Sequence, residues 1–182
     1  MEQVSIDEAY ADITGCQRLH GPPEEMAQKL KTRIKSKVGL TSSIGIAPNK
    51  FLAKIASDMG KPNGLFIIEP HAIAEFVNVL PIKKVPGVGK RVNEALKKMG
   101  VTKLGDISRY SEAVLTKRLG KFGHRLVQLS MGIDETPVRP HPSTKSISSE
   151  ETLSKDTRDK EVLNNFLMRQ AADVGRQLRQ ID

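Results

Sequence analysis

Short β-like runs alternate with helical segments throughout the first 80 residues, and glycines or prolines stand close to most of the changes. The β-like runs are 4–14, 40–46 and 65–68, and the helical segments that follow them are 22–38, 50–59 and 71–79. This β-α-β-α-β-α order predicts a sheet with helices packed against it. The expected buried faces of the first two helices are Met26, Leu30, Ile34 and Val38, and Phe51, Leu52, Ile55 and Met59.

Residues 81–136 have a different pattern, because short helical segments alternate with glycines after Pro81 and Pro86. These segments are 90–99, 104–109, 111–118 and 121–131. The net charge of the chain is +8, and residues 81–142 hold 13 basic and 5 acidic residues while the flanking segments are balanced. We therefore expect a small all-α unit that binds a polyanion. A basic surface that only aids solubility is the alternative.

A third unit covers residues 137–182. Its first prolines, Pro137, Pro140 and Pro142, stand among mostly polar residues, which is typical of a linker. A possible strand over 146–148 and a helix over 159–178 follow, and together they bury too little apolar surface for a stable domain. The expected fold class is therefore mixed α+β: a partial sheet with packed helices, a small all-α unit and an incomplete strand-helix segment.

The adjacent acids Asp7 and Glu8 are candidate catalytic metal ligands. Mg²⁺ prefers oxygen ligands and keeps several waters, so a site for nucleotidyl transfer needs two or three carboxylates. Neighbours on a regular strand point to opposite faces, so this pair can share an ion only at a strand end or at a bend. Its place early in the first β-like run allows such a site. A solvent-exposed strand end is the alternative.

Lys61 lies in the turn Lys61-Pro62-Asn63-Gly64, between a helix and a strand. A lysine held in such a turn is a suitable point-charge partner for the β- and γ-phosphates of a nucleotide. An ordinary surface turn is the alternative. Lys50 and Lys54 are four residues apart on the preceding helix, and we expect them to form a solvated face. The alternative is that one of them helps to bind phosphates.

The segment Pro86-Gly87-Val88-Gly89-Lys90 is a more specific pattern. Its two glycines let the backbone turn tightly and approach a partner, and the helix that begins at Lys90 directs free amides toward an anion. This is the helix-hairpin-helix pattern of sequence-independent binding to the DNA backbone. A dinucleotide-binding loop is the rival, although no strand directly precedes these glycines. Gly120 and Lys121 form either a second hairpin or a structural turn.

Four stretches closely resemble the Y-family of translesion DNA polymerases, with the bacterial DNA polymerase IV branch nearest. They are Ser5–Thr14, Gly45–Met59, Lys61–Gly64 and Val85–Lys90, in the order of the family. The resemblance covers essentially all 182 residues. It implies the rear of the palm over 1–80, the thumb over 81–136, and a linker with the start of the little finger over 137–182.

The resemblance also implies roles for single residues. Asp7 and Glu8 would bind two catalytic Mg²⁺ ions, and Lys61 would touch the incoming triphosphate. The thumb, including its second hairpin, and the start of the little finger would contact DNA. The residues expected at DNA are Gly87, Val88, Gly89, Lys90, Gly120, Lys121, Lys145 and Ser146. The family's earlier palm strand, which bears a further metal-binding aspartate, has no counterpart here, so we expect a fragment that is inactive alone.

Two functions stay open at this stage. The first is error-prone translesion DNA synthesis, with primer-template DNA and deoxynucleoside triphosphates as partners and a sliding clamp as a candidate partner of the full-length parent. The second is a non-catalytic remnant that binds DNA without sequence preference. The chain starts without the pattern of a signal peptide and has no apolar run long enough to cross a bilayer, so we expect no membrane partner and a cytoplasmic location.

Overall fold

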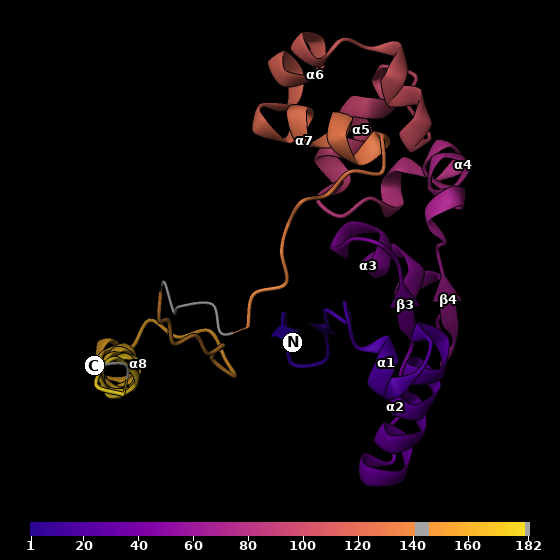
Figure 1. Ribbon diagram of the computed structural model, residues 1–182. Helices are drawn as coiled ribbons and strands as arrows, with labels where there is room; N and C mark the ends of the chain where they lie inside the picture. Colours follow the sequence, from indigo (N-terminus) through magenta and orange to yellow (C-terminus); the bar gives the residue numbers. More distant parts are fainter. Residues whose placement is uncertain (141–145, 181–182) are drawn as a thin grey trace. The chain divides into compact units, whose positions relative to one another are not determined.

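The computed structural model describes residues 1–140 and 146–180. The chain divides into a compact unit over Met1–Pro140 and a second unit over His141–Asp182, and each is described by itself (Figure 1). Mixed helix and sheet structure confirms the expected fold class. The finer domain boundaries at residues 80 and 136 stay predictions.

The acidic segment at the start is a hairpin turn, and the expected continuous strand over 4–14 is wrong. β1 (Glu2–Gln3) pairs antiparallel with β2 (Ala9–Tyr10), and residues 4–8 form the turn between them. The amide of Val4 donates to the carbonyl of Glu8 at 2.9 Å, which closes this turn. The hydroxyl of Ser5 accepts the amide of Glu8 at 3.1 Å, and a short polar side chain of this kind stabilises a turn over a strand.

A second sheet has the β-α-β arrangement that the alternation predicts. β3 (Ile44–Ile46) pairs in parallel with β4 (Leu65–Ile67), and α3 (Lys50–Met59) connects them. Gly45 lets α3 lie directly on the strand, because a Cβ there would stand 2.2 Å from the carbonyl oxygen of Ala53. The remaining helices of this region are α1 (Gln17–His20), α2 (Pro23–Val38), η1 (Pro70–Ala72) and α4 (Ile73–Val79).

Burial along α2 differs from the expected stripe. Ala27 is its one buried residue, whereas Leu30 is 50% and Val38 is 62% exposed. A 16-residue helix is about 24 Å long, and a sheet of two strands spaced by about 4.8 Å is too narrow to cover it. The inward position expected for Met59 is also wrong, because this side chain is 44% exposed at the end of α3.

The region after Pro81 is all-helical, as predicted. Its elements are η2 (Ile82–Lys84), α5 (Lys90–Lys98), η3 (Leu104–Arg109), α6 (Glu112–Leu119) and α7 (Lys121–Ser130). The segment 104–109 is a 3₁₀-helix, in which Asp106 accepts the amides of Thr102 and Lys103 at 2.9 Å each. Side chains that bond the backbone locally in this way favour short tight helices.

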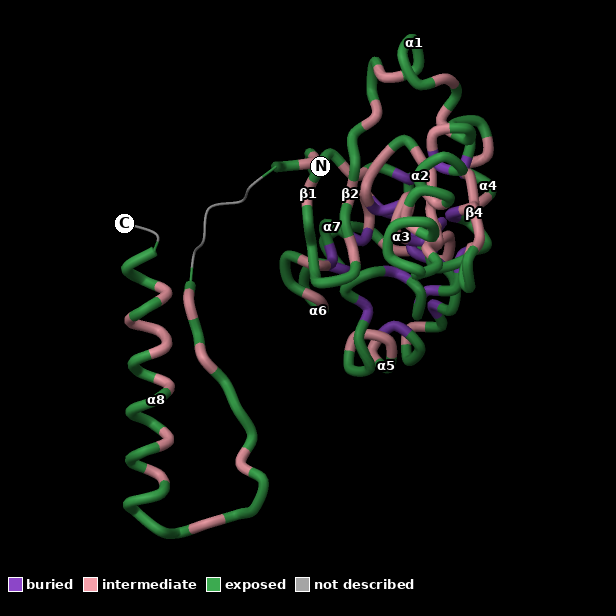
Figure 2. Tube along the Cα trace, turned by 90° about the horizontal axis from the view of Figure 1, so that it is seen from below, coloured by how far each residue is buried: buried purple, intermediate pink, exposed green. Residues whose placement is uncertain are grey.

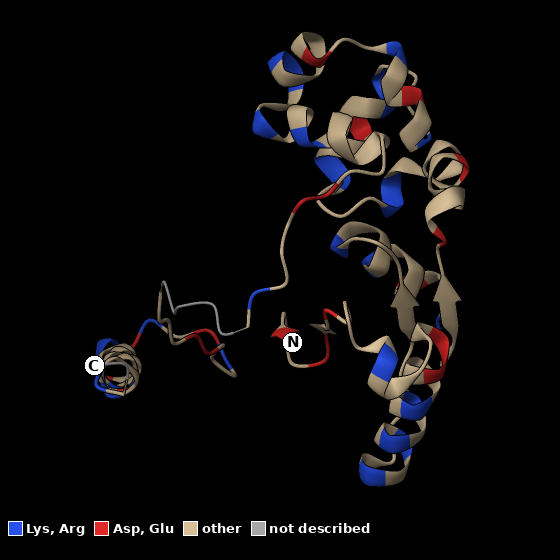
Figure 3. Ribbon diagram, in the orientation of Figure 1, with Lys and Arg blue, Asp and Glu red and all other residues tan. Residues whose placement is uncertain are grey.

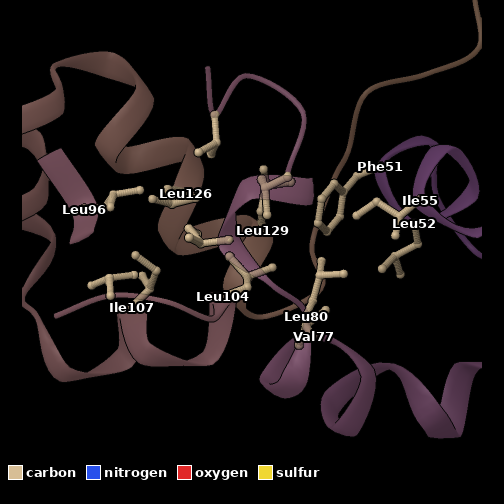
Figure 4. Close-up of a cluster of buried hydrophobic side chains, with 14 of the residues drawn as sticks. Phe51, Leu52, Ile55, Val77, Leu80, Leu96, Leu104, Ile107, Leu126 and Leu129 are labelled. Carbon is tan, nitrogen blue, oxygen red and sulfur yellow. The ribbon is translucent and has the colours of Figure 1, made fainter. Parts of the chain in front are cut away.

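One hydrophobic core runs through both regions of the first unit. Leu52 and Ile55 of α3 belong to the same cluster as Leu80, Leu104 and Leu129 (Figure 4). All five are at most 3% exposed. The sheet region and the all-helical region are therefore joined by continuous apolar packing.

Two side chains cap the N-terminus of α3, one from the residue before the helix and one from a distant part of the chain. The Asn49 side chain accepts the amide of Leu52 at 3.0 Å and donates to the carbonyl of Gly132 at 2.8 Å. Asp134 accepts the amide of Phe51 at 3.0 Å. The segment that leaves α7 therefore satisfies one free amide of α3 and also holds the side chain of the local cap.

Removing the second cap will weaken the first unit. We expect Asp134→Ala to lower the free energy of unfolding by about 1–2 kcal/mol, because the partly buried Phe51 amide loses its acceptor. Urea unfolding followed by circular dichroism measures the loss. The matched control is Glu135→Ala, which removes an exposed neighbouring acid and should stay within about 0.5 kcal/mol of the parent. Equal stability of the two variants would contradict the cap.

The second unit consists of an extended segment and one long helix. α8 (Lys160–Leu178) begins at Asp159, whose side chain accepts the amides of Glu161 and Val162. The expected strand over 146–148 is wrong: these residues have no regular structure, since a single strand without a neighbour has no ladder to stabilise it. No residue of α8 is buried, and Figure 2 draws the helix without buried positions.

Within the described residues, no helix combines the length and the apolar character that crossing a membrane requires.

Candidate polymerase and DNA-binding sites

The turn between β1 and β2 presents Asp7 and Glu8 next to each other. The Ser5 hydroxyl donates to Asp7 Oδ1 at 2.7 Å, so this carboxylate is held by its own turn. Glu8 Oε1 accepts from Lys54 Nζ at 2.5 Å, which ties the turn to α3. Asp7 and Glu8 therefore lie in a turn and not on a regular strand, and each carboxylate has a partner within the protein.

Alternating charges connect the acidic turn with Lys61. Lys54 pairs with Glu8 and also approaches Asp58 Oδ2 at 3.6 Å, one helical turn further along α3. Asp58 Oδ1 in turn accepts from Lys61 Nζ at 2.7 Å. The side chains of Glu8, Lys54, Asp58 and Lys61 therefore form one charge ladder. It brings the turn that carries Lys61 to the acidic turn that carries Asp7 and Glu8.

The surroundings of Asp7, Lys54 and Asp58 shift the pKa values of these three groups. The hydroxyl of Ser5, the amide of Asp7 and the charges of Lys61 and Lys54 hold the pKa of the Asp7 carboxyl below its usual value. Burial opposes the charge of Lys54, but its bond to Glu8 and the charge of Asp58 outweigh burial and raise the pKa of its ammonium. Burial likewise opposes the charge of Asp58, and the two lysines still lower its pKa. These groups are ionised at neutral pH.

A second ion pair anchors the base of the hairpin. Lys50 Nζ donates to both carboxylate oxygens of Glu2 at 2.7 and 2.8 Å and lies 4.8 Å from the centre of the Tyr10 ring. Glu2 also accepts the amide of Arg139 at 2.7 Å. The bond from Lys50 and then that from Arg139 lower the pKa of the Glu2 carboxyl. The expected solvated face of Lys50 and Lys54 is wrong, since their side chains are only 14% and 27% exposed.

The acidic turn fits a magnesium ion in the chemistry of its donors. Asp7 and Glu8 offer the hard oxygen ligands that Mg²⁺ prefers, and the ion keeps its remaining ligands as water. No group of three or more His, Cys, Asp or Glu side chains that could hold an ion occurs among the described residues. The turn therefore supplies a carboxylate pair and not a complete protein site.

The two glycines of the hairpin before α5 differ in their surroundings. Gly87 has φ +91°, and its Cα faces the ring of Phe122, 2.6 Å from where a Cβ would stand. Gly89 has ordinary dihedrals, and a Cβ there would meet nothing within 4 Å. No internal contact requires a glycine at position 89. The Val88 amide donates to the carbonyl of Val85 at 3.0 Å, so the amides at the open end of α5 are those of Gly89, Lys90 and the next residues.

The second glycine pair has mixed roles. Gly120 has φ +62° and open space at its Cα, and it ends α6 where α7 begins with Lys121. Gly123 serves packing, because a Cβ there would stand 2.4 Å from the backbone of Leu115 in α6. The structural turn of the sequence interpretation is thus present, and the exposed pair Gly120-Lys121 stays a DNA-contact prediction.

Basic side chains surround both hairpins. Figure 3 shows Lys and Arg on α5, α6 and α7. The exposed basic residues next to the hairpins are Lys83, Lys84, Lys90, Arg91, Lys117, Arg118, Lys121 and Arg125. In the second unit Ser146 is exposed, and Lys145 lies outside the described residues.

Sequence reasoning missed the residues that assemble the ladder. Asp58 was not among the candidates, and Lys54 was assigned to a solvated face. The spacing of Lys54 and Asp58 is i, i+4 on one helix face and could have indicated their pairing. The contact between Lys54 and Glu8 joins residues 46 positions apart, which no local pattern encodes.

Known families match the chain in three consecutive parts. Residues 1–58 match the impB/mucB/samB family, residues 83–134 match the DNA polymerase-iota thumb domain, and residues 144–182 match the impB/mucB/samB family C-terminal domain. Among curated proteins, the DNA polymerase IV of Yersinia enterocolitica is 42% identical over 181 residues, which are 100% of this chain and 51% of that protein. The DNA polymerase IV of Shewanella woodyi is 45% identical over 156 residues, which cover 86% of this chain and 43% of that protein.

Solved structures agree with these relatives. A Y-family DNA polymerase chimera has a TM-score of 0.81 at 36% identity and covers 96% of this chain and 51% of that one. DinB from Sulfolobus solfataricus has a TM-score of 0.70 at 34% identity, with 96% and 52% covered. The chain spans about half the length of the curated relatives it matches. Family matches in chain order, sequence identity and fold agree, and the chain belongs to the Y-family of DNA polymerases as a DinB-like member.

Proposed function

We propose that this chain carries part of the nucleotidyl-transfer site of an error-prone translesion DNA polymerase. The observation that supports this most directly is the charge ladder from Glu8 through Lys54 and Asp58 to Lys61, whose lysines also act on the carboxylate of Asp7. The whole protein would join a deoxynucleotide to the 3′-hydroxyl of a primer on a DNA template. A solved structure of a similar protein is described as an insertion ternary complex of a DNA polymerase, with 32% identity and a TM-score of 0.65.

Each residue has a defined task in this proposal. Asp7 and Glu8 would hold Mg²⁺, with Asp7 ionised because its pKa is lowered. When bound, two such ions gather triphosphate oxygens and lower the pKa of the attacking hydroxyl. Lys61 would leave Asp58 for a phosphate oxygen of the nucleotide. Lys54 would stay on Asp58 while Glu8 turns to the metal.

The chain alone should bind a divalent ion and yet show no polymerase activity. We expect Mn²⁺ to broaden the amide signals of residues 6–9, because Asp7 and Glu8 face one ion. Asp7→Asn should weaken this broadening about tenfold, since half of the carboxylate pair is lost. Purified chain with primer-template DNA, nucleotides and Mg²⁺ should give no extension, because two carboxylates do not hold two ions in place.

Asp12→Asn is the matched control. Asp12 is an exposed acid that follows β2, and its side chain accepts the amide of Thr14, so this change should leave the broadening as it is. Equal broadening in Asp7→Asn and the parent would contradict the metal site. Magnesium-dependent extension that disappears in Asp7→Ala would contradict the expected inactivity of the chain.

A second function is favoured by the open Gly89 and the exposed lysines beside it. In this candidate the chain binds the DNA backbone without sequence preference and without catalysis. The free amides at the start of α5 and the ammonium groups of Lys83, Lys84 and Lys90 would meet phosphates. Gly87, Gly120, Lys121, Lys145 and Ser146 stay predicted contacts. A cytoplasmic location, and a sliding clamp as partner of the longer protein, stay predictions as well.

A further inference from the structure

Lys31 of α2 directs its ammonium into a group of backbone and amide oxygens. It donates to the carbonyl of Ser42, to the carbonyl and Oδ1 of Asn63 at 2.9 Å each, and to the carbonyl of Gly64 at 3.3 Å. Asn63 and Gly64 are the last two residues of the turn that carries Lys61. A side chain 32 positions earlier in the sequence therefore closes this turn.

Two other contacts fix the position of the turn. The carbonyl of Gly64 accepts the amide of Ile44 at 3.1 Å, which joins the turn to β3. Gly64 also lies against Gly60, because a Cβ at Gly64 would stand 2.0 Å from the Gly60 carbonyl oxygen. Asn63 adopts a left-handed φ of +51° between these contacts. The Lys31 ammonium is the contact that reaches the turn from α2.

The ammonium group of Lys31 has partners of a different kind from those of Lys29 and Lys61. Lys29 on the same helix pairs with the carboxylate of Glu25 at 3.4 Å, and Lys61 pairs with Asp58. Lys31 has neutral oxygens as its hydrogen-bond partners among the described residues. An ammonium has three N–H donors, and four acceptors around it keep it in one place. Its positive charge is not cancelled by an acid, so it adds to the positive character of the turn.

We propose that Lys31 is a positioning residue for the polyphosphate site of Lys61. By fixing Asn63 and Gly64, it holds the turn so that the ammonium of Lys61 stands beside Asp58 at the edge of the acidic turn. The ligand class is a polyphosphate, as in a nucleoside triphosphate. This inference rests on the proposed function, in which Lys61 meets the phosphates.

Inorganic tripolyphosphate is the probe for the test. The ¹⁵N-labelled full chain is titrated at low ionic strength, and the amide signals of Asn63 and Gly64 are followed with and without the probe. Lys61→Met should weaken binding about fivefold, since one exposed charge contact is lost. Lys31→Met should weaken it about threefold and also move both amide signals before any probe is added. The matched control is Lys37→Met, which removes an exposed positive charge from the same helix and should change neither readout.

Lys31→Arg separates position from charge. It keeps the positive charge, but a planar guanidinium cannot place its donors at one point as an ammonium does. We therefore expect Lys31→Arg to shift the amide signals of Asn63 and Gly64. Its affinity for tripolyphosphate should lie between those of Lys31→Met and the parent. Binding equal to the parent in Lys31→Arg, together with weak binding in Lys31→Met, would show that charge alone suffices and would overturn the positioning role.

The two proposals fail in different ways. If Lys61→Met binds tripolyphosphate as the parent does, the role of Lys61 in the proposed function is wrong. If Lys61→Met binds weakly while Lys31→Met keeps both the binding and the turn signals of the parent, only the positioning role is wrong. Should Lys31→Met not fold, Asn63→Gly removes the Oδ1 acceptor and tolerates the left-handed φ. Unchanged signals of Gly64 and unchanged binding in that variant would also overturn the inference.

Discussion

Gly45→Ala will lower the free energy of unfolding by about 3 kcal/mol. The added methyl group would stand 2.2 Å from both the Ala53 carbonyl oxygen and the Ser57 amide nitrogen, and 2.8 Å from the carbonyl carbon of Ala56. All three are backbone atoms of α3, so no side chain can rotate away. Either α3 must leave β3, or the parallel pairing of β3 with β4 must break. Urea unfolding monitored by circular dichroism gives the size of the loss.

Gly89→Ala is the matched control for this substitution. It adds the same methyl group at ordinary dihedrals, φ −73° and ψ 179°, where nothing lies within 4 Å. We expect its stability to stay within about 0.5 kcal/mol of the parent. If Gly45→Ala were as stable as Gly89→Ala, the close contact between α3 and β3 would be wrong.

Single lysine changes beside the α5 hairpin will reduce the salt dependence of DNA binding. Lys83→Ala, Lys84→Ala and Lys90→Ala should each lower the slope of log affinity against log salt by up to about 1, because each removes one phosphate contact. The three together should weaken binding at about 0.1 M salt on the order of 100-fold. Fluorescence anisotropy with a labelled duplex of arbitrary sequence measures both quantities.

The control for the lysine series is Lys37→Ala, an exposed lysine of α2 outside residues 81–142. Its slope should equal that of the parent. A second duplex of unrelated sequence should give the same set of slopes, because backbone contacts carry no sequence information. Unchanged slopes in all three lysine variants would remove the α5 hairpin from the DNA interface.

The elements that local patterns encode were predictable from the sequence. Helix α3 and the helices after Pro86 occur where turn residues and apolar spacing predicted them. The turn around Asp7 was not predictable from the sequence. A β-like run of residues does not reveal that the Ser5 hydroxyl accepts the amide of Glu8. The exposure of Leu30 was missed for another reason: periodicity identifies an apolar face, but not whether the sheet is wide enough to cover it.

The candidate site was predictable in its parts and not in its assembly. Asp7, Glu8 and Lys61 stand out by residue type and by turn chemistry. The contacts that join them pass through Lys54 and Asp58, and the turn of Lys61 is closed by Lys31. These partners lie on helices whose sequence looks like an ordinary charged surface. Only the folded arrangement of α2 and α3 gives them a role.

The apolar packing shared by α3, α4 and α7 has a consequence for any attempt to study the two halves apart. Cutting the polypeptide after Leu80 would strip Leu104 and Leu129 of their partners on one piece and would bare Leu52 and Ile55 on the other. Each piece would then expose apolar surface to water and tend to aggregate. The region that carries Asp7 and Glu8 and the hairpin before α5 are therefore expected to unfold together, as a single cooperative unit.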